Sequence, residues 1–207
     1  MTRPRGTYIC LEGGDGGGKT TLARMICQRF ATKGVNALRY CFPSDNAVGS
    51  LIRQGLMGNV RLDPKAYLYL FAADGMQANT ELKRCLEMGH HVVCDRHPTL
   101  SGRVFQVDHH EIAQVERIYD TAGEDGIMMP DALFVIDIPA EVSLQRMQKR
   151  DKYKDVVFES DKLEQIEVLR QRYLKLAARY SATILDGTRN LDHLVEDVIA
   201  TLSLAPL

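Results

Sequence analysis

A glycine-rich run near the N-terminus, Gly13-Gly14-Asp15-Gly16-Gly17-Gly18-Lys19-Thr20, fits the pattern G-x-x-x-x-G-K-[ST] in full. An apolar stretch precedes the run and an amphipathic stretch follows it. Glycines allow positive φ angles, so the backbone N–H groups of such a loop can surround a phosphate. Its place between a strand and a helix is the context that separates this motif from a chance glycine-rich turn. The run therefore predicts a phosphate-binding loop between a first strand and a first helix.

Each residue type in the loop has a chemical role. Lys19 is expected to reach the β- and γ-phosphates, and the Thr20 hydroxyl is expected to bind Mg²⁺. The helix that begins at Lys19 adds the positive end of its dipole. The loop predicts binding of ATP or GTP with Mg²⁺. The residues assigned to the nucleotide phosphates are Gly13, Gly14, Gly16, Gly17, Gly18, Lys19, Thr20 and Thr21.

The pattern along the chain predicts an α/β fold. Short apolar runs alternate with longer amphipathic stretches, which is typical of βαβ units and a parallel sheet. With no repeat or composition break, residues 1–207 are read as a single domain with a five-stranded parallel sheet flanked by helices. The expected strands are Thr7–Leu11, Val35–Tyr40, His91–Cys94, Leu133–Asp137 and Thr183–Leu185. The expected helices are Lys19–Thr32, Ala47–Met57, Lys65–Met88, Glu111–Tyr119, Ala140–Lys149, Lys162–Tyr180 and Leu191–Leu202.

Glycine, proline and serine mark several helix ends. Gly34 and Gly89 stand where left-handed glycines would end two helices. Asp63-Pro64 and Ser160-Asp161 stand where two other helices would begin.

Composition bounds the class of protein. The formal net charge is −1, from 26 basic and 27 acidic side chains, which gives no overall attraction to nucleic acid or to a membrane. The five cysteines are scattered without a C-x-x-C pair, so we expect neither a disulfide framework nor a zinc site. No apolar run approaches the ~20 residues of a membrane span. These features predict a soluble, cytoplasmic protein without membrane association.

Asp95 and Arg96 end the third expected strand, at the edge of the sheet where ligands bind in open α/β folds. Asp95 could hold Mg²⁺ or its water, and Arg96 could clamp a phosphate. A buried Asp–Arg pair with a purely structural role is the alternative.

Several segments, in order along nearly the whole chain, resemble the thymidylate kinase family of P-loop nucleoside monophosphate kinases. Leu11–Thr21 is similar to its E-G-x-D-G-x-G-K-[ST]-T loop, and Val92–His97 to its strand that ends in D-R-[YH]. Leu70–Asp74 resembles the start of L-F-A-A-D-R, and Pro130–Pro139 resembles P-D-x-x-x-x-L-D-x-P. Asp186-Gly187-Thr188 looks like the loop that lies against the adenine of ATP.

The resemblance implies the three-layer fold of P-loop kinases and ATP-dependent phosphoryl transfer to a pyrimidine deoxynucleoside monophosphate. Transfer would be direct and in line, because positioning and electrostatics carry most of such a reaction. The resemblance also implies a homodimer, adenine contacts from Gly187 and Thr188, and an Asp15 contact to the acceptor sugar. The expected acceptor site comprises Asp15, Phe42, Phe71, Gly75, Arg96 and Arg103.

A basic segment, 145–160, follows the fourth expected strand, where the family carries a lid over the phosphates. A basic lid would exclude water and stabilise charge on the transferring group. Arg146 and Arg150 lie four residues apart on one helix face and are the expected transition-state contacts. The alternative is a solvated helix face.

The acceptor half departs from the family pattern. Gly75 stands where the family has a base-reading arginine, and neither Cys41–Asp45 nor Asp155–Glu159 contains the arginine expected there. Arg53, Arg96 and Arg103 could replace the lost phosphate contacts. Gly75 would leave room for a bulkier base, such as 5-hydroxymethyluracil, as a free nucleotide or within DNA. A degenerate kinase that binds ATP for regulation is the other alternative.

Two sets of side chains have open interpretations. Phe71 could stack on the acceptor base, or it could belong to a plain core stripe with Tyr67, Leu68 and Leu70. Tyr8, His109 and His110 are taken as structural or surface residues.

Overall fold

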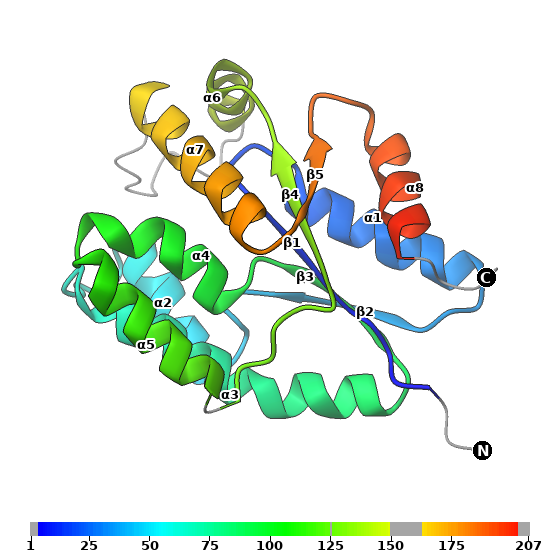
Figure 1. Cartoon of the computed structure of the whole chain (residues 1–207), viewed down its shortest axis with the longest axis horizontal. Coiled ribbons are helices and arrows are strands. Elements are labelled where there is room, and N and C mark those ends of the chain that lie inside the picture. The colour runs from blue at the N-terminus through cyan, green and yellow to red at the C-terminus, as the bar shows by residue number, and fades with distance from the viewer. Residues whose placement is uncertain (1–3, 125, 150–162, 203–207) are drawn as a thin grey trace.

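The computed structural model describes residues 4–124, 126–149 and 163–202. Its strands form one five-stranded parallel sheet in the order β2-β3-β1-β4-β5 (Figure 1). The strands are β1 (Tyr8–Gly13), β2 (Ala37–Cys41), β3 (His91–Asp95), β4 (Ala132–Asp137) and β5 (Thr183–Asp186). The predicted α/β class and parallel sheet are confirmed, and each strand bound lies within two residues of the predicted one.

Helices cover both faces of the sheet (Figure 1). They are α1 (Lys19–Thr32), α2 (Ala47–Leu56), α3 (Ala66–Glu87), α4 (Pro98–Phe105), α5 (Ile112–Glu124), α6 (Ala140–Gln148), α7 (Leu163–Arg179) and α8 (Leu191–Thr201), with a 3₁₀ turn η1 (Gln106–Asp108). None of these helices is both long and apolar enough to span a membrane.

Strand alternation divides the core between the two faces. Ile9 and Leu11 of β1 pack with α1 and α8 on one face. Tyr8 packs with α3 on the other face, where β4, α4 and α7 share a further cluster around Val135 and Tyr173. All six residues of β1 are buried, as expected for a central strand covered on both sides. The first strand therefore fixes the phosphate loop to the most buried part of the fold.

Three segments meet at the carboxyl end of the sheet. Leu11 of β1 pairs with Asp95 of β3, so the phosphate loop begins beside the end of β3. The segment after β2 joins them, because the Phe42 N–H donates to the Asp95 carbonyl at 3.1 Å. This edge is where open parallel sheets bind ligands.

Helix α4 is absent from the helices that the sequence predicts. His97 caps the helix: its Nδ1 accepts a hydrogen bond from the Thr99 hydroxyl at 3.1 Å and lies 3.4 Å from the Leu100 N–H. Pro98 occupies the first turn, where its missing N–H costs nothing. Histidine is not among the usual capping residues, so the start of the helix carries no standard sequence signal.

Most other helix ends agree with the sequence. Gly34 and Gly89 have the expected positive φ angles, 71° and 82°. Helix α5 runs five residues beyond the predicted end at Tyr119, to Glu124. Ser160-Asp161, predicted to open a helix, lies outside the described residues.

The burial of His97 predicts a pH-dependent stability. Desolvation lowers the pKa of this imidazole from 6.5 to about 4, although its bond to the Met128 carbonyl acts in the opposite direction. Between pH 6.5 and 4 the unfolded chain therefore binds a proton that the folded chain does not, so acidification through this window lowers the free energy of unfolding. Denaturant melts of the wild type and of His97→Asn across this window should show a shallower pH slope for the variant.

His193→Gln provides the control, because His193 is exposed on α8. This variant should keep the wild-type slope. An unchanged slope in His97→Asn would contradict the assignment to His97.

Candidate active site

The phosphate loop has a backbone that glycine alone can adopt without strain. Gly13 has a φ of +134°, and a Cβ there would lie 2.5 Å from the Ile136 carbonyl oxygen. Gly18 has a φ of +88° and caps the N-terminus of α1. The loop therefore passes closely beside β4 and turns into α1 with its N–H groups at the helix start, which is an arrangement suited to an anion.

Lys19 lies inside this loop. Its Nζ donates to the Gly13 carbonyl at 2.9 Å and to the Gly14 carbonyl at 2.8 Å. Burial, with a contribution from the nearby Arg96, lowers the pKa of Lys19 to about 8. The ammonium group is therefore desolvated and held beside the loop, so an anionic ligand would stabilise its charged form.

Thr20 and Asp95 form the candidate metal site. The Thr20 hydroxyl donates to Asp95 Oδ2 at 2.5 Å, so one hydroxyl and one carboxylate lie together at the loop. Mg²⁺ typically keeps several waters and takes one or two carboxylates together with substrate phosphates. In the part of the chain that the structure describes, no group of three His, Cys, Asp or Glu side chains could hold a metal. The donor set fits an ion that a bound triphosphate helps to hold.

A small cavity of about 150 Å³ lies over the phosphate loop. Its lining is mostly polar, with residues from the phosphate loop, α1, the end of β3 and the segments that follow β2 and β3. The lining residues are Asp15, Gly16, Gly18, Lys19, Thr20, Phe42, Asp95 and Arg96.

Arg96 stands at the centre of the site. Its Nη2 donates to Asp15 Oδ1 at 2.6 Å, and its Nη1 donates to the Tyr173 hydroxyl at 2.6 Å. The guanidinium also lies over the Phe105 ring, 5.3 Å from the ring centroid. Its backbone has a φ of +74°, an unusual conformation for a residue with a side chain. The surrounding contacts thus hold both the backbone and the side chain of this arginine.

The side chain of Glu12 is buried beside Arg96. It is fully buried, and its carboxylate accepts from the His97 N–H at 2.8 Å and from the Ser101 hydroxyl. Arg96 Nη1 lies 4.0 Å from Glu12 Oε2. Burial raises the pKa of Glu12, and the nearby Arg96 opposes that shift.

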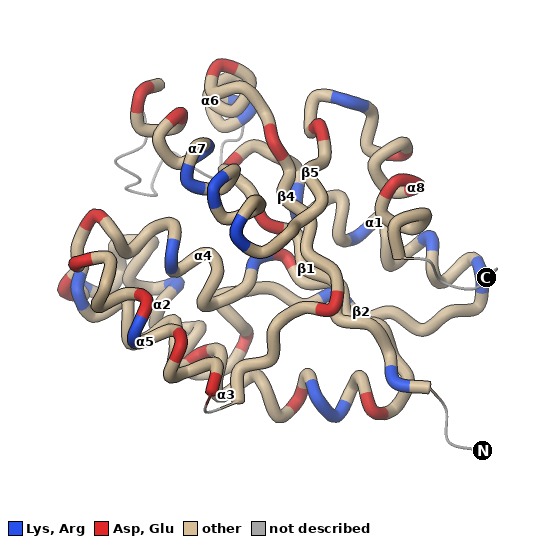
Figure 2. The backbone as a smooth tube through the Cα atoms, viewed as in Figure 1, with Lys and Arg blue, Asp and Glu red and all other residues tan. Residues whose placement is uncertain are grey.

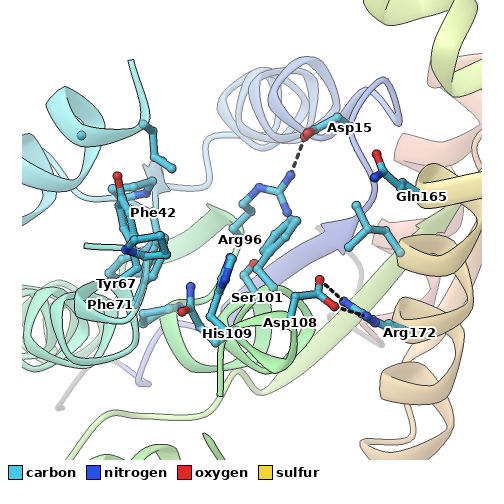
Figure 3. A pocket seen from close by; sticks show the side chains of 18 of the residues that line it. Asp15, Phe42, Tyr67, Phe71, Arg96, Ser101, Asp108, His109, Gln165 and Arg172 are labelled. Carbon is cyan, nitrogen blue, oxygen red and sulfur yellow. Dashed lines mark hydrogen bonds and ion pairs between the residues drawn. The ribbon is translucent and has the colours of Figure 1, made fainter. Parts of the chain in front are cut away.

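A second, larger cavity of about 780 Å³ adjoins the first. The two cavities share Asp15, Phe42 and Arg96 as lining residues. Figure 3 shows Phe42, Tyr67 and Phe71 on one side of the large cavity and Gln165 and Arg172 across from them. A group that enters the large cavity can therefore meet a ligand of the phosphate loop beside Arg96.

The two aromatic side chains predicted for the acceptor site both line the large cavity. Phe42 also lines the small cavity and is buried. Phe71 is half-buried and packs against the apolar cluster around Leu68 and Tyr119. Phe71 thus belongs to the core and to the cavity wall at once, and its stacking role stays a prediction.

Two arginines predicted to bind the acceptor phosphate are engaged elsewhere. Arg103 pairs with Glu116 and Asp120 of α5, and its side chain is only 8% exposed. Arg53 donates to the Pro43 and Ser44 carbonyls. Neither residue lines either cavity, so the assignment of Arg103 to the acceptor site is corrected to a structural one. Of the three candidate replacements, Arg96 alone lines the cavities.

The prediction that Gly75 leaves room for a larger base is wrong. Gly75 is buried in α3, and a Cβ there would lie 2.6 Å from Pro98 Cγ and 2.8 Å from Ile127 Cδ1. It does not line the large cavity. The packing of α3 against α4, rather than open space, occupies this position.

The lid residues are described only in part. Arg146 Nη1 donates to the Gly16 carbonyl at 3.2 Å and to the Gly187 carbonyl at 3.0 Å, so it links the phosphate loop to the loop after β5. Thr188 follows in that loop and bonds the Asp186 carboxylate through its N–H and its hydroxyl. Arg150, and the predicted lid from residue 150 onward, lie outside the described residues.

Sequence reasoning missed several residues of the site. Tyr173 and Arg172 lie on α7, far from the recognised motifs, and nothing in their local sequence separates them from other helical residues. Gln106 is a polar residue between Phe105 and Val107, yet it is only 4% exposed and lines the large cavity. Its place in an apolar run was the signal that could have found it.

Comparison with known proteins gives one consistent family. The family model described as Thymidylate kinase matches residues 11–198 of the chain. A protein named "Probable thymidylate kinase" from Methanocaldococcus jannaschii is 28% identical over 200 residues, which cover 96% of this chain and 97% of that protein. A "Thymidylate kinase" from Thermosipho africanus is 30% identical over 196 residues, covering 92% and 94% of the two chains.

The packing at Gly75 predicts the outcome of adding a side chain there. Gly75→Ala should lower the free energy of unfolding by about 1–3 kcal/mol, because the methyl group overpacks the contact with Pro98 and Ile127. Gly123→Ala in α5 is the matched control, since a Cβ there meets nothing within 4 Å; it should be neutral or add up to ~1 kcal/mol. Denaturant melts measure both values. A Gly75→Ala protein as stable as the wild type would contradict this prediction, because it would show that α4 shifts to accommodate the methyl group at little cost in stability.

Proposed function

The chain belongs to the thymidylate kinase family, and we propose that it transfers the terminal phosphoryl group of ATP to a pyrimidine deoxynucleoside monophosphate. The observation that carries this proposal is the junction of two cavities at Asp15, Phe42 and Arg96. A small polar cavity over the phosphate loop suits the donor phosphates. A large cavity walled by aromatic residues suits a nucleoside, and the junction is where the two phosphates would meet.

All residues expected on the donor side except Arg150 and the rest of the lid are among the described ones. Lys19 would move from the Gly13 and Gly14 carbonyls to the β- and γ-phosphates, helped by the loop N–H groups. Thr20 and Asp95 would hold Mg²⁺. When bound, that ion offsets the charge that develops on the phosphate oxygens. Arg146 would keep the loop aligned with Gly187, beside the expected adenine site.

The acceptor side needs a cation near the reacting phosphate and an apolar place for the base. Arg96 supplies the cation, because it is already oriented by Asp15 and Tyr173 and faces both cavities. A charge held in place before the reaction stabilises the transition state without reorganisation. Phe42, Tyr67 and Phe71 supply the apolar wall. We therefore place the acceptor phosphate at Arg96 and the base near these three rings.

Charge favours a free nucleotide over a base within DNA. A DNA substrate calls for a basic rim around the acceptor cleft. The described lining of the large cavity holds the acids Asp15, Asp108 and Glu164 beside the two arginines Arg96 and Arg172. Each arginine is paired with an acid. Helices α3 and α5 carry both acidic and basic residues, whereas α7 has its acids in its first half and its basic residues in its second (Figure 2). The structural basis for a 5-substituted base at Gly75 is also lost.

The proposed activity can be tested with labelled ATP and Mg²⁺ against dTMP, dUMP, dCMP, 5-hydroxymethyl-dUMP, dGMP and duplex DNA with or without 5-hydroxymethyluracil. We expect label to pass to the pyrimidine nucleotides, with dTMP among the best, and not to DNA. Lys19→Ala should reduce the rate by about 100-fold or more, because it removes the positive charge that stabilises the phosphoryl group during transfer. Label found only in modified DNA, or in no acceptor at all, would refute the proposal.

The lowered pKa of Lys19 predicts a pH dependence of ATP binding. An ATP phosphate beside the ammonium should raise the pKa of Lys19 above its free value of about 8. Binding is then strongest below pH 8, and its affinity should fall by up to ~10-fold per pH unit above it. Calorimetry at pH 8.5 in buffers of different ionisation enthalpy should detect proton uptake. Lys19→Met should bind more weakly and take up no proton. A pH-independent affinity between pH 7 and 9 would exclude this role for Lys19.

A further inference from the structure

Helix α6 lies directly against the phosphate loop. A Cβ at Gly16 would lie 2.9 Å from the Ser143 carbonyl oxygen and 3.2 Å from Ser143 Cα, so the two backbones approach as closely as a glycine allows. Ser143 is only 1% exposed, and its hydroxyl donates to the Asp15 carbonyl at 2.7 Å. Arg146 of the same helix donates to the Gly16 carbonyl at 3.2 Å. Two consecutive carbonyls of the loop are therefore held by α6.

Four consecutive carbonyls of the loop, those of residues 13–16, accept hydrogen bonds from side chains. Lys19 holds the first two, and α6 holds the other two. The two sets differ in what a bound nucleotide would do to them. Lys19 would leave its carbonyls for the phosphates, whereas Ser143 lines neither cavity. The bond from Ser143 to the Asp15 carbonyl is therefore expected to persist when a nucleotide binds.

This bond sets the direction of the peptide group between Asp15 and Gly16. The only cis peptide bond among the described residues lies elsewhere, at Phe42-Pro43. In a trans peptide the carbonyl and the following N–H lie in one plane and point in opposite directions. Because the Asp15 carbonyl is turned toward α6, the Gly16 N–H is directed away from that helix. Gly16 lines the small cavity, so the peptide presents its N–H, rather than its oxygen, on the side of the expected phosphates.

The peptide group needs such a restraint because a glycine follows the carbonyl. Gly16 has a φ of +76°, and glycine populates positive and negative φ angles about equally, so rotation of the peptide meets little steric resistance. A rotated peptide would remove one N–H donor from the loop. It would also point the Asp15 carbonyl oxygen, which carries partial negative charge, at the anion that such loops bind.

We propose that Ser143 is a positioning residue, which keeps the peptide between Asp15 and Gly16 turned so that its N–H donates to a phosphate of ATP. Ser143 acts through the loop and does not touch the nucleotide. The side chain of Asp15 has a restraint of its own, because Arg96 Nη2 donates to its carboxylate at 2.6 Å. The Ser143 hydroxyl therefore governs the donor side of Asp15, and Arg96 governs the acceptor side. This inference rests on the proposed binding of ATP.

The test measures the affinity for ADP by calorimetry in the wild type and in Ser143→Ala, without an acceptor. We expect the variant to bind ADP about 3- to 10-fold more weakly, which is the range that one lost hydrogen bond produces. In steady-state assays its KM for ATP should rise by the same factor. Its KM for dTMP should stay within about twofold of the wild-type value, because Arg96 still holds the Asp15 carboxylate. A residue with only a structural role would change the melting temperature and leave both KM values unchanged.

Ser143→Cys separates the hydrogen bond from packing, because the thiol fills the space of the hydroxyl but donates weakly. It should bind ADP nearly as weakly as Ser143→Ala. Thr201→Val is the matched control, since the Thr201 hydroxyl also donates to a backbone carbonyl, at 2.8 Å, but lies at the end of α8 and lines neither cavity. It should keep the wild-type affinity.

The outcomes separate this inference from the proposed function. Wild-type affinity for ADP in a folded Ser143→Ala protein would overturn the inference and leave the kinase activity standing. A wild type that binds ADP but phosphorylates no pyrimidine nucleotide would overturn the proposed function alone. A wild type that binds no ADP would overturn both.

Discussion

The site depends on a carboxylate that is held entirely out of water. Glu12 lies at the end of β1, and its oxygens accept hydrogen bonds from the His97 backbone and the Ser101 hydroxyl. A buried charge is tolerated only when partners compensate for its lost hydration. Those partners fix the start of α4 against the end of β1, and Arg96 Nη1 lies 4.0 Å from Glu12 Oε2. The phosphate loop and one wall of the large cavity are therefore positioned by a single buried ion.

The place of the phosphate loop between β1 and α1 could be predicted from the sequence because its determinants are local. One contiguous run, Gly13–Thr20, contains the loop, the lysine and the hydroxyl, and the apolar strand before it indicates its place in the sheet. Asp95 and Arg96 could be placed beside that loop because parallel strands end at a common edge. The alternation of apolar runs and amphipathic stretches gave the strand bounds to within two residues.

The large cavity could not be predicted to the same depth, because its walls come from segments far apart in the chain. Helix α4 could not be predicted because its N-cap is His97, and histidine is not a usual capping residue. Arg103 has the charge expected of a phosphate ligand, but the acids of α5 hold it away from the cavities. Gly75 was predicted to leave open space because the sequence does not show which neighbouring side chains pack against a glycine. Only the packing of α3, α4 and η1 shows that Gln106, rather than residue 75, meets the cavity.

Helix α7 contacts the site through several side chains. Tyr173 holds the Arg96 guanidinium. Arg170 forms a two-armed pair with Asp137 at the end of β4, and Arg172 forms another with Asp108 at the end of η1. Through these contacts α7 is connected to the segment after β3, to β4 and to η1. A tilt of α7 that widens the large cavity would therefore also move Arg96, which lies where the two cavities meet. The width of the large cavity and the position of the Arg96 guanidinium are thus linked through one helix.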